Sequence, residues 1–90
     1  MNLTDIIVEV FGPEPPCVRC ITVKRIVEKV AQKLAPEGFN VKVERKHIIS
    51  KDTVSKYGVL LSPAVAVNGK VKTMGRIPKE EEIGKLIRQA

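Results

Sequence analysis

Ninety residues, of which 43% are hydrophobic, are enough for one compact domain with a single core and too few for two. The net charge of +6 is compatible with binding to phosphate, but single-strand nucleic-acid binders also need aromatic stacking platforms, and only 3% of these residues are aromatic. No apolar run approaches the roughly 18 residues of a membrane span, and the N-terminus lacks the basic start of a secretory signal. We therefore expect a cytoplasmic protein with neither nucleic acid nor membrane among its partners, whose positive charge attracts acidic proteins.

The first half of the chain has the pattern of a strand, a helix and a second strand. Residues 3–11 carry β-branched and apolar side chains on both faces, as a central strand does, and Gly12 with the following prolines breaks this run. Apolar residues recur at helical spacing over 18–35, and residues 39–46 alternate as in a partly exposed strand. This order predicts a right-handed βαβ unit with parallel strands.

The second half begins with a shorter helical segment. Residues 50–57 start with Ser50, which can cap a helix, and we expect Val54 and Tyr57 to face inward. An Asn-Gly pair at 68–69 then separates two β-patterned runs, which predicts an antiparallel hairpin.

The chain closes with a third helical segment over residues 78–89. It opens with Pro78 and a cluster of acids and ends with basic residues, as the helix dipole favours. Its expected buried face consists of Ile83, Leu86 and Ile87. The predicted fold class is therefore α/β, with a four-stranded mixed sheet and the element order β-α-β-α-β-β-α.

The only two cysteines, Cys17 and Cys20, form a CxxC motif at the start of the first predicted helix. A disulfide between them would close too short a loop to stabilise the fold appreciably, so redox or metal chemistry is the better reason for the pair.

A cysteine at a helix N-terminus has its thiolate stabilised by unpaired backbone N–H groups and by the helix dipole. Cys17 holds that position, and Arg19 and Lys24 would favour its thiolate further. Cys20 lies one turn later and should be more covered. We therefore expect Cys17 to attack a disulfide and Cys20 to resolve the mixed disulfide.

Two segments carry a family resemblance. "KYGVLLSPAVAVNGKV" (56–71) resembles the thioredoxin pattern of Tyr-Gly-Val, a proline that is cis in the family, an apolar strand and a glycine turn, and "TMGRIPKEEEIGKLI" (73–87) resembles its last strand and helix. With the preceding CxxC, the chain is most similar to the small thioredoxin- and glutaredoxin-like redox-active disulfide proteins of archaea and bacteria. The resemblance implies a thioredoxin-like fold without the extra N-terminal strand and helix of full-length thioredoxins.

The resemblance also implies roles for three residues. Pro63 would be cis and would present the backbone of Ser62 to an extended substrate segment. Glu9 is the candidate for the buried acid that moves protons beneath the cysteines; the alternative is a carboxylate at the strand edge that reaches a surface cation. The dipeptide Val18-Arg19 is neither the Gly-Pro of thioredoxin nor the Pro-Tyr common in glutaredoxin, and no Trp precedes Cys17.

These features predict a thiol–disulfide oxidoreductase that reduces or exchanges protein disulfides through Cys17 and Cys20, with no bound cofactor. Its partners would be disulfide-containing clients and an electron donor, either a thioredoxin reductase or glutathione. The alternative is a carrier of copper or zinc, because two thiolates suit soft metal ions. Copper carriers with this motif end on a strand, whereas this chain is expected to end on a helix.

Overall fold

The computed structural model describes residues 4–13 and 18–90, and it confirms the predicted α/β architecture. A single turn of 3-10 helix (Ala35–Glu37) follows the first helix. In chain order the strands and helices are β1 (Thr4–Gly12), α1 (Val18–Leu34), β2 (Phe39–His47), α2 (Lys51–Tyr57), β3 (Ala64–Val67), β4 (Lys70–Met74) and α3 (Glu80–Arg88).

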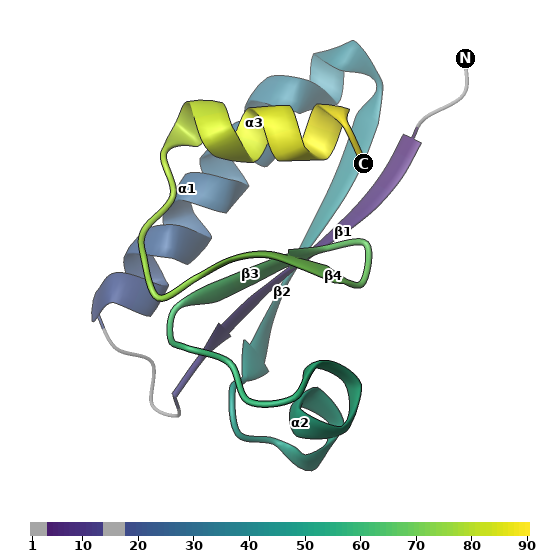
Figure 1. Cartoon of the computed structure of the whole chain (residues 1–90). Helices are drawn as coiled ribbons and strands as arrows, with labels where there is room; N and C mark the ends of the chain where they lie inside the picture. Colours follow the sequence, from purple (N-terminus) through teal and green to yellow (C-terminus); the bar gives the residue numbers. More distant parts are fainter. Residues whose placement is uncertain (1–3, 14–17) are drawn as a thin grey trace.

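The four strands form one mixed sheet in the order β2-β1-β3-β4 (Figure 1). β1 and β2 run parallel, as the βαβ pattern predicts, with Thr4 opposite Phe39 at one end and Gly12 opposite His47 at the other. β3 is antiparallel to both β1 and β4. The edge strands β2 and β4 both carry exposed basic side chains, namely Lys42, Arg45, Lys46, Lys70 and Lys72.

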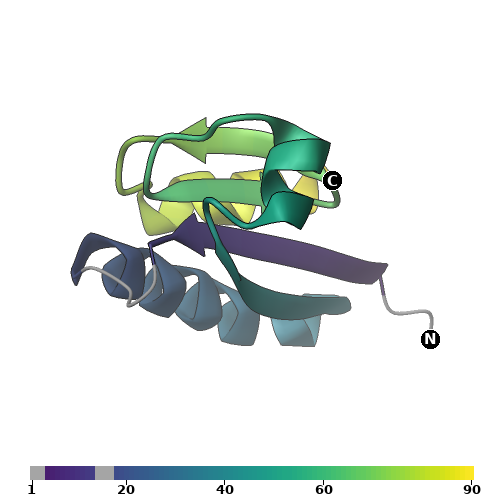
Figure 2. The ribbon, with the colours of Figure 1, turned by 90° about the horizontal axis from the view of Figure 1, so that it is seen from below.

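The helices divide between the two faces of the sheet. α1 and α3 lie side by side, and α2 lies apart from them (Figures 1 and 2). Alternate residues of β1 and β3 face the main core between the sheet and the α1–α3 pair, which contains Ile6, Val8, Val10, Val23, Val27, Val30, Leu34, Val65, Val67, Ile83 and Ile87. A smaller core under α2 contains Phe11, Ile48, Leu60, Ala64 and Ala66.

α2 covers only part of its face of the sheet. The rest of this face, on β1 and β2, carries polar side chains that pair with one another. Asn40 Nδ2 donates to Asp5 Oδ1 at 3.0 Å, and the Glu44 carboxylate lies 3.8 Å from Lys42 Nζ and 3.2 Å from Lys46 Nζ. Such exposed ion pairs contribute little to stability, and they make this face hydrophilic.

The predicted hairpin is confirmed, and its turn has the backbone that an Asn-Gly pair favours. Both central residues have positive φ angles, 50° at Asn68 and 83° at Gly69, as a type I′ turn requires. Asn68 also ties the turn to β1: its side-chain oxygen accepts from the N–H of Ile7 at 2.9 Å, and its own N–H donates to the Ile7 carbonyl at 2.8 Å.

Two local predictions are wrong. Gly12 belongs to β1 rather than to the following loop, because its carbonyl accepts from the N–H of Ile48 at 2.9 Å and β2 continues alongside it. Val54 does not face inward, since 42% of its surface is exposed. Thr53 is buried instead, with its hydroxyl donating to the His47 carbonyl at 2.9 Å. In a helix of seven residues, two apolar positions were too few to define the inner face.

No helix within residues 4–13 and 18–90 has the length and hydrophobicity needed to cross a membrane.

Candidate functional site

Cys20 lies in the first turn of α1 with only 1% of its surface exposed. Its sulfur is 3.2 Å from the hydroxyl oxygen of Ser62, a residue 42 positions further along the chain. The start of α1 and the segment before β3 therefore meet at Cys20, as the family resemblance implies. Cys17 falls outside the described residues, so its predicted attacking role stays a prediction.

Gly12 makes room for the sulfur of Cys20. A Cβ added to Gly12 would overlap with Cys20 Sγ and would lie 3.0 Å from Cys20 Cβ. The same atom would be 3.9 Å from Ser62 Oγ. Any larger residue at the end of β1 would therefore have to displace Cys20 or push α1 away from the sheet.

The segment that carries Ser62 is fixed on both sides. The Ser62–Pro63 peptide bond is cis, Pro63 is fully buried, and β3 begins at the next residue. The N–H of Gly75 donates to the carbonyls of both Leu61, at 3.2 Å, and Pro63, at 2.9 Å. These bonds hold the segment against the end of β4.

Arg19 reaches the same place from the helix side. Its guanidinium Nη2 donates to the carbonyl of Gly75 at 3.0 Å. This bond joins the start of α1 to the loop after β4, a contact that sequence analysis did not predict. Lys24, the other cation expected near the thiolate, instead lies 3.8 Å from Glu28 one turn along the helix.

Glu9 interacts with Tyr57. It lies on the α2 side of the sheet, where Tyr57 donates its hydroxyl to Glu9 Oε1 at 2.7 Å and packs edge-on against Phe11 with ring centres 5.2 Å apart. The pKa of Tyr57 is raised to about 12, first by burial, then by the hydrogen bond to the Glu9 carboxylate and by its negative charge. Cys20 belongs to α1, which covers the other face of the sheet. These contacts do not test the proton relay predicted for Glu9, which stays a prediction.

Two of these residues, Gly12 and Tyr57, were not predicted from the sequence to be parts of the site. Gly12 was interpreted only as a strand breaker, although a glycine just before a CxxC loop could have indicated a close approach of two chain segments. Tyr57 was noted for its place in the Tyr-Gly pattern, but nothing in the sequence pairs it with Glu9. Within residues 4–13 and 18–90, no group of three or more His, Cys, Asp or Glu side chains could hold a metal ion.

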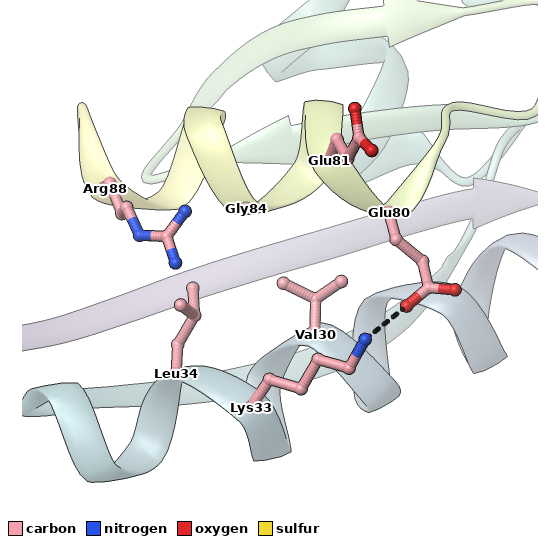
Figure 3. Close-up of a pocket in the computed structure, with 7 residues that line it drawn as sticks. All are labelled: Val30, Lys33, Leu34, Glu80, Glu81, Gly84 and Arg88. Atoms are coloured by element: carbon pink, nitrogen blue, oxygen red, sulfur yellow. Dashed lines mark hydrogen bonds and ion pairs between the residues drawn. The ribbon is translucent and has the colours of Figure 1, made fainter.

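A separate groove of about 170 Å³ lies between α1 and α3 (Figure 3). Its lining includes Val30, Leu34 and Gly84, and the ion pair between Lys33 and Glu80, 3.0 Å apart, crosses one side. Val30 is about three helical turns beyond Cys20, so this groove is not part of the cysteine site.

Comparison with known proteins agrees with this geometry. The family model for the thioredoxin domain matches residues 6–88. The chain belongs to the thioredoxin domain family. A thioredoxin from Methanothermobacter thermautotrophicus is 29% identical over 80 residues, which cover 89% of this chain and 95% of that protein. A thioredoxin from Methanocaldococcus jannaschii is 30% identical over 79 residues, which cover 87% of this chain and 88% of that protein.

A solved structure supports the thioredoxin-like fold. The solution structure of the oxidised thioredoxin from Plasmodium falciparum superposes with a TM-score of 0.63 at 13% identity, covering 96% of this chain and 81% of that one. The family match and the two archaeal relatives make the chain a thioredoxin-type redox protein. Its first helix begins with a turn that contains a buried cysteine, Cys20.

Proposed function

We propose that the protein is a thiol–disulfide oxidoreductase that cycles Cys17 and Cys20 between dithiol and disulfide. The observation that carries this proposal is the position of Cys20: buried, in the first turn of α1, and 3.2 Å from the Ser62 hydroxyl. A resolving cysteine needs this kind of cover, because it should react with its neighbour rather than with clients in solution.

The proposed cycle has two exchange steps. The Cys17 thiolate attacks one sulfur of a client disulfide, so the client S–S bond breaks, a mixed disulfide forms, and the first client sulfur leaves as a thiolate that takes a proton from solvent. Cys20 then loses its proton and attacks Cys17, which releases the second client thiol and forms the Cys17–Cys20 disulfide. The client gains two electrons and two protons, and a reductase or glutathione returns the protein to the dithiol.

Exposed apolar residues next to Arg19, Ser62 and Gly75 in the chain suit a protein client. Val18, Leu61 and Met74 are large apolar residues with 79%, 63% and 47% of their surfaces exposed. Exposed apolar side chains around a reactive centre are typical of protein-interaction sites. We propose disulfide-bearing proteins as clients, and the backbone of Ser62 as the edge along which a client segment pairs. We also propose that the protein acts in the cytoplasm, where reducing conditions would restore the dithiol.

An insulin-type disulfide reduction assay combined with a redox titration tests this function. We expect the parent protein to reduce the substrate, and Cys17→Ser to be inactive. Cys20→Ser should accumulate a mixed disulfide through Cys17, seen by mass spectrometry. An inactive parent that binds Cu(I) or Zn(II) tightly would instead support the metal-carrier alternative.

A further inference from the structure

The guanidinium of Arg19 is held in place by a neutral group. Its bond to the Gly75 carbonyl, at 3.0 Å, uses one of the five N–H donors of the side chain. A carbonyl oxygen carries no net charge, so this bond fixes the direction of the side chain without neutralising it.

Two other arginines of the chain, Arg76 and Arg88, face carboxylates. Arg88 makes two bonds to Glu37, at 3.2 and 3.0 Å, and Arg76 binds both carboxylate oxygens of Glu82. These pairs place a negative charge directly beside each guanidinium. Arg19 differs from these two arginines. A hydrogen bond fixes its orientation, but the partner in that bond, a backbone carbonyl, has no negative charge to balance the guanidinium.

Arg19 and its acceptor Gly75 have exposed apolar residues as neighbours. Val18 precedes it in α1, Met74 precedes its acceptor Gly75, and Leu61 Cβ and Cδ1 lie 3.6 Å from where a Cβ of residue 75 would be. We call Val18, Arg19, Leu61 and Met74 the Arg19 rim. The same Gly75 binds the carbonyls of Leu61 and Pro63, so the rim borders the segment that carries Ser62.

We propose that the Arg19 rim selects protein clients with a carboxylate and an apolar side chain next to the target disulfide. This inference rests on the proposed oxidoreductase function and names its substrate class. The apolar side chain packs on Leu61 and Met74, and the carboxylate accepts hydrogen bonds from the donors of Arg19 that Gly75 does not use. The planar, forked guanidinium suits a carboxylate better than a lysine ammonium does. The overall charge of +6 attracts the same clients over longer distances.

Single-turnover reduction of two synthetic peptides tests this inference. Both peptides carry the same internal disulfide and an adjacent Leu, and they differ only in a flanking Glu or Gln. Fully reduced protein is mixed with each peptide, and the release of peptide thiols is followed. We expect the Glu peptide to react about fivefold faster at low salt, since an exposed ion pair is worth up to about that factor, and the advantage should shrink as salt is added.

Three variants assign this preference to the rim. Arg19→Ala should abolish it and Arg19→Lys should retain only part of it. Arg25→Ala should keep it, because Arg25 is another exposed arginine of α1 and its loss changes the net charge equally. Equal rates for both peptides with the parent protein, or equal slowing of both by Arg19→Ala, would overturn the inference. If neither peptide is reduced by the parent protein, the proposed function itself fails.

Discussion

The sulfur of Cys20 and the hydroxyl of Ser62, which lie 3.2 Å apart, join the first helix to the segment before β3. Either atom could donate in the resting protein. When Cys20 is deprotonated to attack Cys17, the hydroxyl becomes the donor and stabilises the sulfur anion. The residue before the buried proline therefore contacts the sulfur proposed to resolve the mixed disulfide.

Replacing Ser62 by Ala should slow the second exchange step. Loss of the hydroxyl reduces the population of the Cys20 thiolate, although the remaining thiolate is more nucleophilic, so we expect the mixed disulfide to resolve about threefold more slowly. Acid-quenched mass spectrometry of the Cys17–client adduct measures this rate. Ser62→Thr keeps a hydroxyl and serves as the control; an unchanged rate in Ser62→Ala would show that the contact does not assist exchange.

Gly12→Ala should disturb Cys20 directly. The added methyl group would overlap with the sulfur and crowd Cys20 Cβ at 3.0 Å, so a change of side-chain rotamer alone cannot relieve it. We expect a loss of about 1–3 kcal/mol in the free energy of unfolding, as for other overpacked sites, together with faster alkylation of Cys20. Chemical denaturation and mass mapping of the alkylated thiols measure the two effects.

Gly84→Ala is the matched control. A Cβ at this buried glycine of α3 would lie 3.5 Å from Arg88 Nη1 and 3.8 Å from Val30 Cγ1, which are ordinary contact distances. Since alanine also has a higher helix propensity than glycine, this variant should be more stable than the parent protein by about 1 kcal/mol. Equal effects of the two substitutions would mean that the space at Gly12 has no special role.

Thr73 and Thr53 should respond oppositely to replacement by valine. Thr73 is buried, and within the described part of the chain its hydroxyl has no hydrogen-bond partner. Thr73→Val removes that polar atom and should raise the free energy of unfolding by about 1 kcal/mol. Thr53 is equally buried but bonds the His47 carbonyl and the Ser50 hydroxyl, so Thr53→Val should lower it by about 1–3 kcal/mol. Urea unfolding compares the two variants, and destabilisation by both would contradict the assignment for Thr73.

The stability of the protein should fall in alkaline solution in a way that depends on Tyr57. Its pKa is raised from 10.0 to about 12, so the folded state keeps a proton that the unfolded state loses above pH 10. The stabilisation is therefore complete below pH 10 and is lost as the pH rises through about 12.

Tyr57→Phe isolates this contribution from the titration of lysines. The difference in thermal midpoint between the parent protein and this variant should narrow between pH 10 and 12. Glu9→Gln, which removes the negative charge beside Tyr57, should lower the tyrosine pKa measured by ultraviolet absorbance. A constant difference in midpoint across this range would contradict the raised pKa.

The sequence was sufficient to predict those elements whose structure depends on interactions between residues close together in the chain. The Asn68-Gly69 turn needs only its own backbone preferences, and the long apolar repeat of α1 needs only a partner sheet. The last helix was also predictable, because Ile83 and Ile87 mark its buried face on their own.

Long-range contacts could not be predicted in this way. The bond from Arg19 to Gly75 spans 56 residues, and that from Tyr57 to Glu9 spans 48. Both depend on how the layers of the sheet and helices come together. The family pattern marked Ser62 and Pro63 as parts of the site, but only the structure shows how close Gly12 lies to the sulfur of Cys20.

The basic side chains on β2 and β4 have a consequence for the protein in a crowded solution. Both strands are edges of the sheet, where backbone N–H and C=O groups can pair with a strand of another molecule. Lys42, Arg45 and Lys46 on one edge, and Lys70 and Lys72 on the other, bring like charges together whenever two copies approach edge to edge. The same lysines and arginine that make the chain basic thus protect its open sheet from aggregation, and this protection weakens as salt screens the charges.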